Sequence, residues 1–341
     1  MTGPGPVVGD VGEIDLLRML EPYLDRDAAS LLLAAGDDGA IWQPGASKAV
    51  VVTTDSLVED VHFHRLDGDT GFNTDLGWKL LAISLSDLAA MGASAGPSFL
   101  ALSFPPDWPV ADVEALYRGL AECAREHRAT LAGGNLSGGA IAVLTSICLG
   151  EVVADMALRR TGAVPGWKLA VTGRLGGAAA AVRVPVGADT APAVAKVARA
   201  AWTARLRRPR PRLVEARALA DEGIRVCLDV SDGLYLDAGR LLKEGLGIVI
   251  DPERIPLEDG VRDAFPDAWV ELAGGGEDYE LLFAGPAERV DAACRRIVDD
   301  GGEATVVGGL DTGAGVRLRG ADGGESPAPR SGHQHFRAQQ G

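Results

Sequence analysis

The sequence of 341 residues has a shortage of positive charge and of cysteine. Its 33 Lys and Arg residues face 48 Asp and Glu residues, which gives a net charge of −15 at pH 7. Nucleic acids and anionic membrane surfaces attract proteins with basic patches, so we expect neither as a partner. The cysteines form no C-x-x-C pair, and we interpret them as reduced, buried thiols rather than disulfides or zinc ligands. They are Cys123, Cys148, Cys227 and Cys294.

Long apolar runs are also missing. No stretch approaches the ~20 apolar residues that a membrane-spanning helix requires, and residues 1–6 lack the basic and apolar regions of a signal peptide. We therefore expect a soluble, cytoplasmic protein. At ~150 residues per domain, the length predicts two domains.

The common nucleotide-binding motifs are absent. The sequence contains no P-loop, no G-x-G-x-x-G segment and none of the H-R-D or D-F-G signatures of protein kinases. It also has no EF-hand loop and no His or Cys spacing typical of transition-metal sites. A nucleotide or metal site in this chain must therefore use a different arrangement of residues.

Apolar periodicity predicts two successive series of strands and helices that meet near residue 155. A β-branched run over residues 49–54 predicts a buried strand, and residues 74–91 have the spacing of a long helix. A basic segment broken by proline, residues 205–212, connects parts of the second series. The predicted domains are residues 10–154 and 155–320, followed by a mobile tail of residues 321–341.

Acidic residues recur where predicted strands and helices end. Asp55 follows the strand over residues 49–54, and Asp229 and Asp232 flank Ser231 after another short apolar run. Asp87 continues an apolar stripe of the long helix, and burying an unpaired carboxylate costs several kcal/mol. Asp87 therefore needs a basic residue, capping amides or a metal. The structural alternatives are a solvent-facing helix end for Asp87, a turn for Asp55 and a helix N-cap for Asp232.

A glycine-rich segment, residues 133–139, precedes another predicted strand. Its glycines would let backbone amides approach a phosphate, and the alternative is a flexible hairpin loop. Carboxylate oxygens suit Mg²⁺ or Ca²⁺, and Mg²⁺ is commonly shared with substrate phosphates. The acids and this segment together predict an enzyme that uses Mg²⁺ and a nucleotide.

Five segments, in this order, resemble the motifs of the thiamine-monophosphate kinase family. They are AGDDGA at residues 35–40, TTDSLV at 53–58 followed by His62, LSDLAAMGA at 85–93, DVSDGL at 229–234 and GGEDYEL at 275–281. The resemblance implies a two-domain α+β fold like that of aminoimidazole ribonucleotide synthetase. It further implies a homodimer whose N-terminal domains pair into a β-barrel.

The resemblance also implies an activity, the last step of thiamine diphosphate biosynthesis. ATP would transfer its γ-phosphoryl group directly and in line to thiamine monophosphate, with more than one Mg²⁺ ion and with K⁺ as a further candidate cation. The implied catalytic residues are Asp55, Asp87 and Asp229. The implied metal ligands are Asp38, Thr53, Thr54, Asp55, Asp87, Asn135, Asp229 and Asp232. The implied ATP contacts are Gly134, Asn135, Arg160, Ser231 and Tyr117, and the implied substrate contacts are His62, Glu277 and His333.

Two positions depart from the family pattern. Asn135 stands where the family usually has Asp, so one negative charge is lost, and His333 replaces a larger aromatic residue. Two other functions stay open. The chain could be another ATP-dependent enzyme of the same superfamily, or a non-catalytic protein that binds Mg²⁺ and nucleotide.

Overall fold

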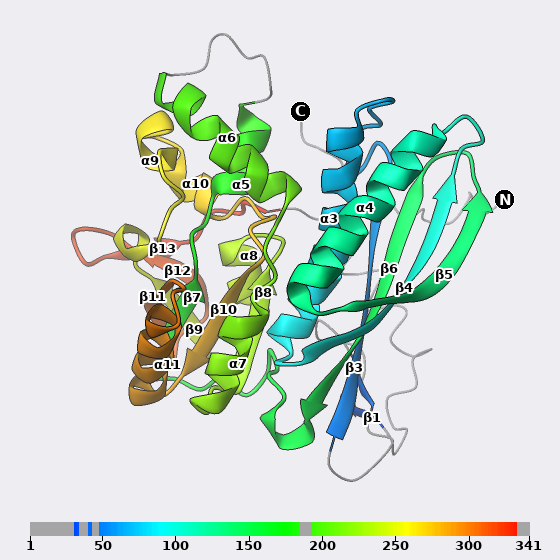
Figure 1. Ribbon diagram of the computed structural model, residues 1–341. Coiled ribbons are helices and arrows are strands. Elements are labelled where there is room, and N and C mark those ends of the chain that lie inside the picture. Colours follow the sequence, from blue (N-terminus) through cyan, green and yellow to red (C-terminus); the bar gives the residue numbers. More distant parts are fainter. Residues whose placement is uncertain (1–30, 34–39, 43–47, 185–192, 333–341) are drawn as a thin grey trace, which may run out of the picture.

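The computed structural model of the chain describes residues 31–33, 40–42, 48–184 and 193–332 (Figure 1). These residues form two β-sheets, one in each half of the chain, with helices packed against them. The fold is therefore of the predicted α+β class. The predicted boundary near residue 155 falls in the short helix η2 (Ala154–Met156), which lies between the last strand of the first sheet and the first strand of the second.

The first sheet has six strands in the order β1-β2-β3-β6-β4-β5. Neighbouring strands are antiparallel, except that β4 and β5 run parallel. The described strands form an open sheet and no closed barrel, so pairing of two copies stays a prediction. The strands are β1 (Leu31–Leu33), β2 (Ala40–Trp42), β3 (Lys48–Val58), β4 (Ser94–Phe104), β5 (Thr130–Gly138) and β6 (Val143–Val153).

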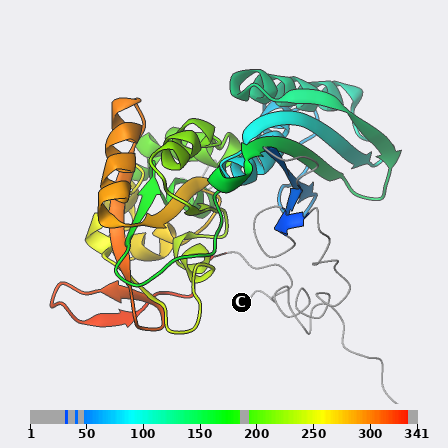
Figure 2. The same ribbon diagram turned by 90° about the horizontal axis from the view of Figure 1, so that it is seen from below.

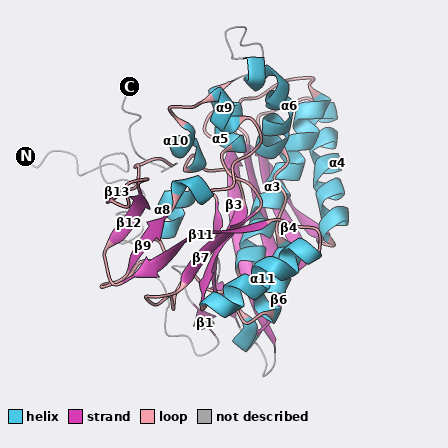
Figure 3. Ribbon diagram, turned by 90° about the vertical axis from the view of Figure 1, so that its left-hand side faces the viewer, coloured by secondary structure: helices cyan, strands magenta, loops and turns pink. Residues whose placement is uncertain are grey.

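Two helices, α3 (Thr70–Ala90) and α4 (Val110–His127), pack side by side next to this sheet (Figures 1 and 3). A Cβ atom added at Gly119 would lie 1.8 Å from the carbonyl oxygen of Thr74. The two helices therefore need glycine at their crossing, because any side chain there would collide with backbone. The helix predicted over residues 74–91 is confirmed.

Helix α3 also contacts the second half of the chain. It packs against the first sheet on one side and against α7 (Leu213–Asp221) and β8 (Val226–Val230) on another. Most of its residues are buried as a result, which explains why its sequence is apolar around much of its circumference. The C-terminal end of α3 thus carries its side chains to the interface between the two halves.

The second sheet has seven strands in the order β13-β12-β9-β11-β7-β10-β8. The strands besides β8 are β7 (Lys168–Thr172), β9 (Gly247–Ile250), β10 (Glu280–Gly285), β11 (Ala304–Asp311), β12 (Gly315–Arg319) and β13 (Glu325–Pro327). The helices besides α7 are α5 (Gly177–Arg183), α6 (Ala193–Arg207), α8 (Leu234–Gly239), η3 (Pro252–Arg254), α9 (Val261–Ala264), α10 (Trp269–Ala273) and α11 (Ala287–Asp299). In the view from below, the two halves lie side by side and the last two strands, in red, extend from the second half (Figure 2).

Two local predictions differ from the structure. The glycine-rich residues 133–139, predicted as a phosphate-binding or hairpin loop, lie mostly in strand β5, because β4 supplies hydrogen-bonding partners along the length of β5. The segment predicted as a tail from residue 321 contains β13, which pairs with β12. Among the described helices, none combines the length and the apolar character that crossing a lipid bilayer requires.

Candidate active site

Three carboxylates that lie far apart in the sequence meet at the interface between the two halves. Asp55 lies on β3, Asp87 lies in the last turn of α3, and Asp229 lies near the end of β8. Their proximity shows in the neighbouring phenol of Tyr279, whose pKa is raised well above its ordinary value first by burial and then by the charges of Glu277, Asp55, Asp229 and Asp87. Both halves of the chain therefore contribute acids to one site.

Each of these acids accepts a hydrogen bond from a hydroxyl group of the first half. Ser84 Oγ donates to Asp55 Oδ2 over 3.1 Å, and Ser86 Oγ donates to Asp229 Oδ2 over 2.8 Å. Thr53 Oγ1 donates to Asp87 Oδ2. The sequence analysis missed Ser84 and Ser86. The available signal was two serines inside an apolar helix, where a hydroxyl group requires a polar partner.

The electrostatics of the site favour a bound cation. Burial raises the pKa of Asp55, although hydrogen bonds with Asp87 and Ser84 lower it in part. The pKa of Asp229 is raised to about 6, mainly by burial. The hydrogen bond from Ser86 opposes this rise, the charge of Asp55 adds to it, and the charges of Arg240 and Arg160 oppose it. Arg240 and Arg160 thus compensate the buried Asp229 only in part.

The donor set consists of hard oxygens, which fits Mg²⁺ better than a transition metal. Within the described ranges, however, no three His, Cys, Asp or Glu side chains are already gathered into a metal-binding group. Thr53 and Thr54 point to opposite faces of β3, since side chains alternate along a strand; Thr53 is buried and Thr54 is exposed. Asp38 lies outside the described residues. The metal ligands therefore stay predictions.

The turn after β8 is held by its own acids and one arginine. Asp237 Oδ2 accepts the backbone N–H groups of Asp232 and Gly233 over 3.0 and 2.9 Å. Asp232, a predicted metal ligand, forms an ion pair with Arg240. Gly233 has a φ of 125°, and a Cβ there would lie 2.1 Å from the carbonyl oxygen of Gly274. Only glycine fits this close approach between two loops.

The loop before β10 lies against that turn. The N–H of Glu277 donates to the carbonyl oxygen of Ser231 over 2.7 Å, and the N–H of Tyr279 donates to the carbonyl oxygen of Val230 over 2.9 Å. Glu277 and Tyr279 adopt left-handed backbone conformations, with φ values of 64° and 51°, which non-glycine residues rarely adopt. Glu277 forms an ion pair with Lys79 of α3. Ser231, which is a predicted ATP contact, and Glu277, which is a predicted substrate contact, are thus neighbours.

The remaining predicted contacts lie around this centre or outside the description. Arg160 lies close enough to Asp229 to lower its pKa, and His62 Nδ1 accepts the N–H of Val58 over 3.0 Å. Gly134 and Asn135 lie exposed on β5, and Tyr117 is exposed on α4. The described residues show no hydrogen bond or ion pair between these three and the acids. His333 lies outside the described residues.

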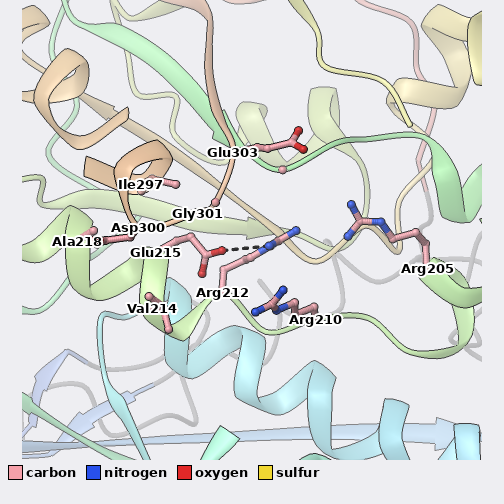
Figure 4. A pocket seen from close by; sticks show the side chains of 12 residues that line it. Arg205, Arg210, Arg212, Val214, Glu215, Ala218, Ile297, Asp300, Gly301 and Glu303 are labelled. Carbon is pink, nitrogen blue, oxygen red and sulfur yellow. Dashed lines mark hydrogen bonds and ion pairs between the residues drawn. The ribbon is translucent and has the colours of Figure 1, made fainter. Parts of the chain in front are cut away.

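A cavity of about 490 Å³ lies in the second half, apart from the predicted site residues (Figure 4). Its lining includes three arginines and three acids, which are Arg205, Arg210, Arg212, Glu215, Asp300 and Glu303. Arg212 forms an ion pair with Glu215 over 3.0 Å. These charges balance, so the cavity does not indicate a class of ligand.

Comparison with known proteins agrees with the fold and with the motifs. Residues 36–152 match the family described as AIR synthase related protein, N-terminal domain. A thiamine-monophosphate kinase of Methanopyrus kandleri is 35% identical over 291 residues, which is 83% of this chain and 85% of that protein.

Two solved structures are similar over nearly the whole chain. AaThiL complexed with AMPPCP and TMP has a TM-score of 0.82 at 26% identity and covers 98% of this chain and 100% of its own. The thiamine-monophosphate kinase of Stenotrophomonas maltophilia has a TM-score of 0.73 at 33% identity and covers 93% of this chain and 96% of its own. These likenesses confirm the predicted fold of the aminoimidazole-ribonucleotide-synthetase type. The chain belongs to the thiamine-monophosphate kinase family.

Proposed function

We propose that this protein transfers the γ-phosphoryl group of ATP to the phosphate of thiamine monophosphate, which yields thiamine diphosphate and ADP. The observation that carries the proposal is the meeting of Asp55, Asp87 and Asp229 at the interface of the two halves, where burial raises the pKa of Asp55 and Asp229. Bare carboxylates would repel both phosphorylated substrates, so these acids can assist only by holding cations. The structure of AaThiL with AMPPCP, an analogue of ATP, and TMP supports this assignment.

Asp55, Asp87 and Asp229 would hold Mg²⁺, with Thr53, Thr54, Asp232, Asn135 and Asp38 as further ligands. Mg²⁺ supplies positive charge that neutralises the transferred phosphoryl group and its neighbours. Ser84, Ser86 and Thr53 fix the directions of the three carboxylates through the hydrogen bonds described above. These bonds would orient the three carboxylates, which the substrates and Mg²⁺ would then draw together into one ligand set.

The protein needs no strong base for this reaction. The acceptor is a phosphate group with a second pKa near 6, so it is largely ionised at neutral pH. Catalysis then depends on positioning the two phosphates in line and on neutralising their charge. We assign Arg160, Ser231, Gly134, Asn135 and Tyr117 to ATP.

The acceptor substrate would lie near the loop before β10. We assign His62, Glu277 and His333 to thiamine monophosphate. Glu277 and Ser231 are joined by a backbone hydrogen bond of 2.7 Å. This contact supports binding of the two substrates side by side. K⁺ is a further candidate cation of the site.

The predicted homodimer belongs to this proposal. The first sheet leaves large apolar side chains exposed, with 39% of Phe99 and 61% of Leu136 accessible. Pairing of the first sheets of two copies, as the predicted barrel requires, would cover such side chains.

The direct test mixes the purified protein with ATP, Mg²⁺ and thiamine monophosphate and separates the products by chromatography. We expect thiamine diphosphate and ADP in equal amounts. ADP formed only with a different phosphate acceptor would indicate another enzyme of the superfamily. Tight ATP binding without any product would indicate a non-catalytic nucleotide-binding protein.

A further inference from the structure

Lys79 is a buried cation with a single acidic partner. It lies on α3 with 7% of its surface exposed, and its Nζ contacts Oε2 of Glu277 from the other half of the chain. The described residues offer it no other hydrogen bond or ion pair. Lysine is almost never this buried without a partner, so Glu277 compensates the charge of Lys79.

The backbone of Glu277 is fixed, whereas the direction of its carboxylate is not fixed by the loop itself. The N–H of Glu277 is bonded to Ser231. The next residue, Asp278, accepts the N–H of Gly176 over 3.0 Å and so anchors the loop on the N-terminal end of α5. About a third of the Glu277 side chain is exposed, and a free glutamate side chain samples several rotamers. The contact with Lys79 removes this freedom.

We infer that Lys79 is a positioning residue, which holds the Glu277 carboxylate in the direction required for contact with thiamine monophosphate. The inference rests on the proposed function. Because an ammonium group already faces this carboxylate, Glu277 serves as a hydrogen-bond acceptor of fixed direction rather than as an unpaired counter-charge for the cationic ring. The chemistry that fits it is a neutral N–H donor, such as the amino group on the pyrimidine ring of the substrate.

The test compares Lys79→Met with a matched control, Lys48→Met. Lys48 also pairs with a glutamate, Glu151, over 2.7 Å, but both side chains are more than half exposed. Methionine keeps the length of the lysine side chain and leaves no unpaired charge inside the protein, since the exposed part of Glu277 can be hydrated. We expect Lys79→Met to raise KM for thiamine monophosphate about tenfold. The kcat and the KM for ATP should change less than about twofold, because neither depends on Glu277. Lys48→Met should change none of the three.

A second comparison separates positioning from general damage to the fold. In the Lys79→Met background, Glu277→Gln should add little to the rise in KM, because the carboxylate has already lost its direction. Two results for Lys79→Met would overturn the inference. One is an unchanged KM for thiamine monophosphate, and the other is a fall in kcat that accompanies equal rises in the KM values for both substrates. If Lys79→Met does not fold, Lys79→Leu, which also removes the donor, replaces it with the same expectations.

Calorimetric titration with thiamine monophosphate keeps this inference distinguishable from the proposed function. If the wild type binds thiamine monophosphate but produces no thiamine diphosphate, the proposed function fails. The inference is then supported by weaker binding to Lys79→Met and overturned by equal binding. If the wild type shows neither turnover nor binding, both fail.

Discussion

Ser86 of α3 donates a hydrogen bond of 2.8 Å to Asp229 of β8 in a buried position. The two residues belong to different halves of the chain, so this contact joins the halves at the centre of the site. Lys79 and Glu277 form a second such contact, and Tyr279 packs its ring into the apolar core of the first half. Assembly of the site and docking of the two halves are therefore one process.

Replacing Ser86 with alanine should destabilise the protein. Asp229 would lose its hydroxyl donor while staying buried, and an unsatisfied buried acceptor costs about 1–3 kcal/mol. Urea denaturation measures the free energy of unfolding. The control is Ser94→Ala, since Ser94 is exposed and bonds only the carbonyl oxygen of Glu151. Equal stability of both variants would contradict a buried link between the halves.

Asp55→Asn should abolish turnover and leave the fold intact. Burial raises the pKa of the Asp55 carboxyl, so replacing it with a neutral amide should not lower the free energy of unfolding. The proposed cation would lose a charged ligand. We expect kcat to fall at least about 100-fold with an unchanged circular dichroism spectrum. Asp60→Asn, at an exposed ion pair with His64, is the control. Normal activity of Asp55→Asn would refute the role of Asp55.

Removal of divalent cations should weaken nucleotide binding. Without Mg²⁺, the triphosphate faces the carboxylates of Asp55, Asp87 and Asp229 directly, and like charges repel. We expect the affinity for ATP, measured by calorimetry, to fall at least about tenfold after treatment with EDTA and to return when Mg²⁺ is added. Affinity that EDTA leaves unchanged would refute the cation-dependent site.

Asp278 should make stability fall as the pH rises. Burial raises its pKa to about 8 in the folded protein, above the value of about 4 of an unfolded chain. At a pH between these two values, the Asp278 carboxyl therefore keeps its proton in the folded state and loses it in the unfolded state. The contribution of Asp278 to stability is full below pH 4 and is lost as the pH rises through about 8.

Asp278→Asn tests this relation, because the amide stays neutral at every pH. Between pH 6 and pH 9 the free energy of unfolding should fall less steeply in this variant than in the wild type. Asp311→Asn is the control, since Arg317 lowers the pKa of that exposed carboxyl and it is already ionised throughout the range. Identical slopes for wild type and Asp278→Asn would contradict a raised pKa at this position.

Gly119→Ala should separate α3 from α4. The new Cβ would lie 1.8 Å from the carbonyl oxygen of Thr74, and relief of such overlap typically costs about 1–3 kcal/mol. Thermal unfolding measures the loss. At Gly71, in the first turn of α3, the nearest atom would lie at an ordinary 3.4 Å, so Gly71→Ala should not destabilise the helix.

Much of the fold could be predicted from the sequence, which also singles out the three acids that the structure brings together; their roles stay predictions. The spacing of apolar residues depends on local geometry, and it correctly predicts a strand over residues 49–54, which lie in Lys48–Val58, and a helix over residues 74–91, which is observed at Thr70–Ala90. Asp87 stood out because a carboxylate on an apolar helical stripe requires compensation. The glycines of residues 133–139 were harder to interpret, since glycine accompanies both phosphate loops and crowded strands. In β5, a Cβ at Gly134 would lie 2.0 Å from the carbonyl oxygen of Leu100, so the neighbouring strand accounts for that glycine.

The sequence by itself determined the α+β class, the acidic character of the site and the family, because these depend on residue types and on spacing along the chain. Only the tertiary structure decided which groups meet. Ser86 reaches Asp229 and Lys79 reaches Glu277 because α3, a helix of the first half, packs against the second half of the chain. No local pattern encodes such contacts, since they form between residues more than a hundred positions apart when burial of apolar surface brings the two halves together.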